Sequence, residues 1–71
     1  VKVGPNPCQG EFDVTVPSRC VMNVTSTSGL LIDQRTLEPG TTHVALDVPS
    51  GLYLVVVTID GERHTTKLVV R

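Results

Sequence analysis

Aromatic side chains are scarce in this chain of 71 residues, which contains one Phe, one Tyr and no Trp. An excess of charge of either sign is also lacking, because Lys and Arg nearly balance Asp and Glu and the formal net charge is −1. Domains that bind nucleic acid carry a basic surface or aromatic side chains on which bases stack. The composition therefore argues against a nucleic-acid partner.

Long apolar runs are missing as well. A membrane-spanning helix needs roughly 20 apolar residues, whereas the longest run here, Leu52 to Val57, has the length of one buried strand. We therefore predict no transmembrane segment, and the pattern of a secretory signal peptide is absent too. The chain begins with Val1, and we interpret it as a fragment of a larger protein that would carry any such peptide elsewhere.

The length allows one domain at most. A domain of this size buries only about 60% of the surface that its unfolded chain exposes. Little room is then left for both a core and a deep catalytic pocket. Size alone favours a binding or signalling role.

Apolar residues recur with a period of two, which is typical of half-buried strands. In Glu11 to Val16, for example, Phe12, Val14 and Val16 share one face and the polar residues share the other. The other segments predicted as strands are 1–3, 20–25, 30–37, 42–48, 52–59 and 63–71. The segment 52–59 is apolar on both faces, which predicts a central or doubly covered strand.

Proline and glycine separate these segments, and both residue types favour turns for known conformational reasons. Asp60-Gly61 predicts a two-residue type I′ hairpin turn, because both central positions of that turn need a positive φ. About seven short strands at regular spacing are typical of a two-sheet antiparallel sandwich. We therefore predict an all-β, immunoglobulin-like sandwich over residues 1–71.

The two histidines, His43 and His64, are the candidate bases and metal ligands. A zinc site needs three or four ligands, and no convergent set is visible, so we read both as exposed strand residues and predict no metal or cofactor. The serines lack the G-x-S-x-G pattern of a nucleophile elbow, and the carboxylates are scattered without an obvious facing pair. We therefore predict that the domain is not an enzyme.

Cys8 and Cys20 each open a predicted strand, which places them near opposite ends of the sandwich. A disulfide needs Cα atoms within about 7 Å, so we predict two free thiols. Cys20 also falls on the apolar face of its strand, where a buried thiol behaves as a small hydrophobic side chain.

The order of the turn residues along the chain is more specific than any single motif. The chain contains Pro5-Asn6-Pro7 followed by Gly10, then Gly29, Gly51-Leu52-Tyr53, Gly61 and finally Lys67-Leu68-Val69-Val70-Arg71. Along essentially its whole length this arrangement resembles the C-terminal sorting domain of the Gram-negative type IX secretion system.

The resemblance implies a C-terminal export signal. A translocon of the outer membrane would recognise the folded domain in the periplasm, and a sortase-like peptidase would then remove it and join the cargo to surface lipopolysaccharide. By position, Lys67, Leu68, Val69, Val70 and Arg71 match the family's recognition segment. The other matched positions are read as setting the fold: Pro5, Asn6, Pro7, Gly10, Gly29, Gly51, Tyr53 and Gly61.

The chain departs from the family pattern at Thr25 to Ser28, at Leu46 to Pro49 and in its two cysteines. These departures leave two alternatives open. One is the retained C-terminal domain of a component of the secretion machinery. The other is an immunoglobulin-like or fibronectin-like module that binds sugar or protein, or merely spaces other domains, and such a module should tolerate sequence after Arg71.

The last predicted strand suggests how a receptor could read the domain. If it is an edge strand, its backbone can pair with a strand of another protein. We therefore predict that Lys67 to Arg71 docks on the translocon by strand addition and charge contacts. An exposed last strand can also exchange between two copies, which predicts a domain-swapped dimer.

Overall fold

The computed structural model describes residues 1–5 and 8–71. Within these ranges the chain forms seven strands and no helix. The strands are β1 (Lys2–Gly4), β2 (Glu11–Val16), β3 (Cys20–Ser26), β4 (Leu31–Leu37), β5 (Gly40–Ala45), β6 (Gly51–Ile59) and β7 (Glu62–Val70).

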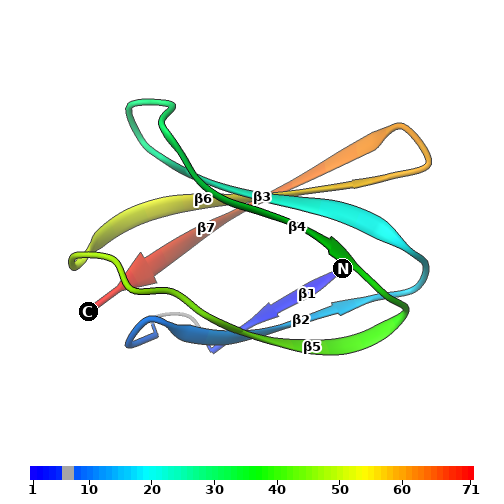
Figure 1. Ribbon diagram of the computed structural model, residues 1–71, viewed down its shortest axis with the longest axis horizontal. Helices are drawn as coiled ribbons and strands as arrows, with labels where there is room; N and C mark the ends of the chain where they lie inside the picture. Colours follow the sequence, from blue (N-terminus) through cyan, green and yellow to red (C-terminus); the bar gives the residue numbers. More distant parts are fainter. Residues whose placement is uncertain (6–7) are drawn as a thin grey trace.

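The strands form two layers that face each other (Figure 1). One sheet has three strands in the order β1-β2-β5, and the other has four in the order β4-β3-β6-β7. Every pairing between neighbouring strands is antiparallel. The predicted all-β, two-sheet antiparallel sandwich is therefore confirmed.

The core lies between the sheets and is built from the alternating apolar residues. Phe12 and Val14 of β2 and Met22 and Val24 of β3 are fully buried. Burying a side chain of this size stabilises the fold by about 1.5–3 kcal/mol relative to its exposed state. The period of two in the sequence thus translates directly into the inner faces of both sheets.

One predicted strand is displaced. The pattern predicts a strand over 42–48, but β5 ends at Ala45. The amide of Leu46 still donates to the carbonyl oxygen of Gly10 at 2.7 Å, which extends the β2–β5 pairing by one residue beyond the end of the strand. Leu46 and Val48 still pack against the core as partly buried residues, so their apolar spacing was real although the strand is shorter.

Strand β6 lies between β3 and β7, as its two apolar faces predict. Val57 points into the core, whereas Val56 lies on the outer face and is nevertheless only 7% exposed. The Asp60-Gly61 turn that follows has φ values of 49° and 80°, as a type I′ turn requires. It joins β6 to β7 with Ile59 opposite Glu62.

Both cysteines are buried and free, as predicted. Cys20 begins β3 near the Thr58 end of β6, whereas Cys8 bridges to Val70, which lies opposite Gly51 at the other end. Burial raises the pKa of the Cys20 thiol. The prediction that Cys8 opens a strand was wrong, because Cys8 lies between β1 and β2 and makes an isolated parallel bridge.

Candidate recognition site

The segment that the sequence singled out, Lys67 to Arg71, forms the end of strand β7 and the residue after it, and β7 lies at the edge of the four-stranded sheet. Its side chains alternate between two environments. Leu68 and Val70 are buried in the core, with exposures of 0% and 4%. Lys67, Val69 and Arg71 point to the outer face and are exposed. Alternate residues therefore anchor the segment and display it.

The outer edge of this segment is occupied by the chain's own backbone. The amide of Cys8 donates to the carbonyl oxygen of Val69 at 2.9 Å, and the amide of Arg71 donates to the carbonyl oxygen of Cys8 at 2.8 Å. We call these two hydrogen bonds the Cys8 clamp. The clamp ties the loop between β1 and β2 to the end of β7, and so links the two sheets.

The preceding part of β7 has a different environment. Glu62, Arg63, His64 and Thr65 are all exposed, although alternate residues point to opposite faces. The β6–β7 hairpin projects beyond the three-stranded sheet, so no strand of that sheet covers its tip (Figure 1). This half of β7 is open on both faces.

A family model described as "secretion system C-terminal sorting domain" matches residues 2–71. The chain belongs to this family. The sorting domain is therefore a C-terminal signal of the type IX secretion system, and its family is one of secretion signals, not of catalytic domains. Such a signal implies interaction with the secretion machinery and export of the protein across the outer membrane to the cell surface or beyond. No curated protein matches the chain.

The described residues of the sorting domain contain no helix that is long and apolar enough to span a membrane.

Two of the residues read as setting the fold have visible structural roles. Tyr53 is 8% exposed, and its hydroxyl donates to the carbonyl oxygen of Pro49 at 2.7 Å, which fixes the entry into β6. Gly10 has a φ of 93°, and a Cβ at this position would lie 2.8 Å from the carbonyl oxygen of Leu46. Only glycine fits there without a shift of the backbone.

For the remaining residues of that set the structure shows a position in the fold but no specific contact. Gly29 and Gly61 adopt positive φ values in turns, and Gly51 begins β6. Pro5 is exposed. Asn6 and Pro7 lie outside the described residues.

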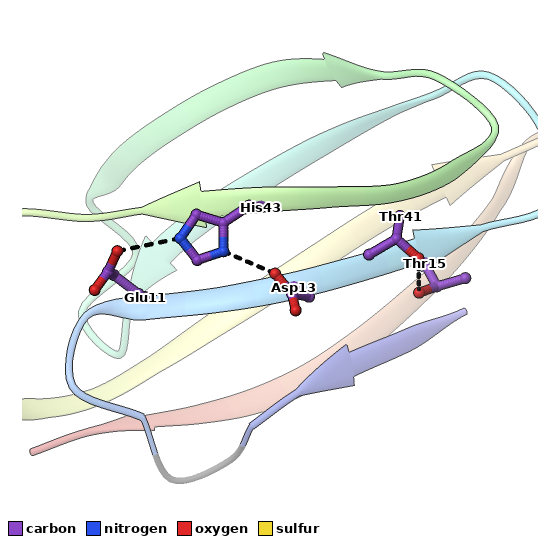
Figure 2. Close-up of polar contacts among 5 residues, drawn as sticks. All are labelled: Glu11, Asp13, Thr15, Thr41 and His43. Carbon is purple, nitrogen blue, oxygen red and sulfur yellow. Dashed lines mark hydrogen bonds and ion pairs between the residues drawn. The ribbon is translucent and has the colours of Figure 1, made fainter.

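The structure also brings together a polar cluster on the outer face of the three-stranded sheet (Figure 2). His43 of β5 lies between two carboxylates of β2, with Nδ1 at 2.8 Å from Asp13 Oδ1 and Nε2 at 3.1 Å from Glu11 Oε1. The hydroxyls of Thr15 and Thr41 are hydrogen-bonded at 2.9 Å on the same face. We call Glu11, Asp13 and His43 the imidazole cluster.

The imidazole cluster gives two of the scattered carboxylates, Glu11 and Asp13, a common partner in His43 that the sequence did not reveal. Alternation placed Glu11, Asp13 and His43 on polar faces, but nothing in a single sequence told that β2 pairs with β5. The hydrogen bond to Asp13, and to a smaller extent the hydrogen bond to Glu11, raises the pKa of His43. Among the described residues no group of three His, Cys, Asp or Glu is arranged to hold a metal ion.

His64 stands apart from this cluster, on the other sheet. Its Nε2 lies 3.9 Å from the Glu62 carboxylate, at the exposed end of β7. Both histidines are therefore exposed strand residues as predicted, but they share no site.

Proposed function

We propose that this chain is a single sorting domain at the C-terminus of a larger exported protein, and that an outer-membrane translocon recognises Lys67 to Arg71 from the periplasm. The observation that carries the proposal is the alternation in this segment. Leu68 and Val70 are buried, whereas Lys67, Val69 and Arg71 are exposed on one face. A receptor can then read the ordered outer side chains only when the domain has folded.

The Cys8 clamp favours one way in which a receptor could bind this segment. Because the outward backbone groups of Val69 and Arg71 already bond to Cys8, a receptor strand would have to displace the clamp to pair there. We therefore replace strand addition at Lys67 to Arg71 by recognition of side chains on the outer face. Two cations beside an apolar Val69 suit a receptor surface that combines acidic and apolar groups.

The later steps of export follow from the same proposal. A sortase-like peptidase of the host removes the domain, which itself has no catalytic role. Exchange of β7 between two copies stays a prediction, and size-exclusion chromatography over a dilution series would detect the dimer.

The experiment fuses the chain to the C-terminus of a periplasmic reporter in a type IX-competent cell. We expect the wild-type fusion and a Lys2→Glu control to reach the cell surface, and a Lys67→Glu/Arg71→Glu variant to stay in the periplasm. The two substitutions leave Leu68 and Val70 in the core, so circular dichroism should show an unchanged fold. Normal export of the double variant would contradict recognition through these side chains.

A further inference from the structure

The outer edge of β7 differs between its two halves in the backbone groups that it offers. In an antiparallel strand the backbone groups of alternate residues point to the same side. Val69 and Arg71 direct theirs away from β6, towards Cys8. Arg63 and Thr65 are separated from Val69 by an even number of residues, so their amide and carbonyl groups also point to the outer edge. Among the described residues no partner reaches these groups.

The surroundings of this edge allow another strand to approach. Arg63 and Thr65 are exposed, and so are Glu62 and His64 on the opposite face. The pairing between β6 and β7 runs without a register shift from Glu62 to Val70, so no bulge interrupts this edge. The Cys8 clamp lies further along β7, at Val69 and Arg71, and the tip of the β6–β7 hairpin lies beyond the three-stranded sheet (Figure 1).

The other edge of the same sheet is protected by two features. The register between β3 and β4 shifts at Val24/Thr25, and such a bulge interrupts the regular spacing that an added strand needs. Asp33 and Arg35, opposite core residues of β3, form an ion pair at 2.6 Å. Charged residues on the inner side of an edge strand also discourage pairing. The register shift has no counterpart in β7 between Glu62 and Val70, whereas Glu62 and His64, opposite the core residues Ile59 and Val57, also lie on the inner side of their strand.

We propose that an extended segment of the translocon adds as a strand to β7 at Arg63 to Thr65. The proposal rests on the sorting function and supplies it with a second contact, distinct from the outer side chains of Lys67 to Arg71. Arg63 forms no ion pair with any described residue. The added segment therefore carries an acidic side chain next to Arg63, because opposite charges on neighbouring strands attract.

The test compares two substitutions of the same residue in the reporter fusion. Thr65→Pro removes the outward amide and places a ring at the edge, where proline is tolerated because that amide has no partner in the sheet. Thr65→Val keeps every backbone group. We expect Thr65→Pro to lower the exported fraction at least about tenfold, which corresponds to 1.4 kcal/mol, and Thr65→Val to stay within about twofold of wild type.

A third variant, Arg63→Glu, keeps the backbone and reverses the charge, and we expect it to lower export several-fold. It decides the question if Thr65→Pro does not fold by circular dichroism. Export of a folded Thr65→Pro at the wild-type level overturns strand addition and leaves the sorting function intact. Retention of Thr65→Pro with normal export of Lys67→Glu/Arg71→Glu supports strand addition and overturns the side-chain contact. Failure of the wild-type fusion to leave the periplasm overturns both proposals.

Discussion

The two halves of β7 belong to one regular strand but have opposite relations to the rest of the molecule. Leu68 and Val70 are buried and the clamp of Cys8 holds the edge beside them. Glu62 to Thr65, by contrast, are exposed on both faces of the strand. Backbone pairing with β6 is continuous through both halves. The comparison teaches that strand regularity and burial are separate properties, and that a small domain can keep one half of a strand for stability and the other for contact.

Removal of core volume under the anchored half should give the largest effect. We expect Leu68→Ala to lower the free energy of unfolding by about 2–5 kcal/mol, because the side chain is fully buried and leaves a cavity. Thr65→Ala in the open half should change it by no more than about 0.5 kcal/mol. Urea denaturation of both variants measures the difference, and similar losses would contradict the division of the strand.

Hydrogen exchange should reveal the same division without a mutation. The amide of Arg71 donates to Cys8, whereas the outward amide of Thr65 has no partner among the described residues. One net hydrogen bond contributes about 1 kcal/mol, so we expect protection of Arg71 to exceed that of Thr65 about fivefold. NMR exchange rates, corrected for the intrinsic rate of each residue, test this expectation. Equal protection would mean that the clamp opens freely.

Titration of His43, which lies in the other sheet, should leave the difference between the two halves of β7 unchanged. The folded-state pKa of His43 is raised above 6.5 by Asp13 and Glu11. The cluster therefore contributes stability that is full below that ordinary value and is lost as the pH rises through the raised pKa.

We expect the thermal midpoint of wild type to fall towards that of His43→Gln over this pH window, by a small amount because the cluster is exposed. The ratio of protection between Arg71 and Thr65 should stay constant over the same window. A change in that ratio would show that the imidazole cluster acts on β7 through the core.

Local patterns predicted the parts of the fold that depend on neighbours in sequence. The alternation from Glu11 to Val16 and the Asp60-Gly61 turn gave strand bounds and a hairpin that the structure confirms. The terminal segment was found through the family resemblance, whereas the exposure of Lys67, Val69 and Arg71 was seen only in the structure. The strand bounds and the hairpin need no knowledge of distant contacts.

Features that join distant segments were missed. The Cys8 clamp joins residues from the two ends of the chain through a parallel bridge, and no hydrophobic period marks such a contact. His43 meets Asp13 only because β2 pairs with β5, which is not the next strand along the chain. A single sequence does not reveal which polar faces will be adjacent.

The Asp60-Gly61 turn also determines which residues of β7 point into the core and which point outward. With Ile59 opposite Glu62, even-numbered residues of β7 point inward, which is why Leu68 enters the core and Lys67 does not. One residue inserted into the turn would exchange the two sets, so that a lysine would meet the interior and a leucine the solvent. The set of side chains that the sorting domain displays to its receptor thus depends on the length of a turn that is not itself part of the proposed contact.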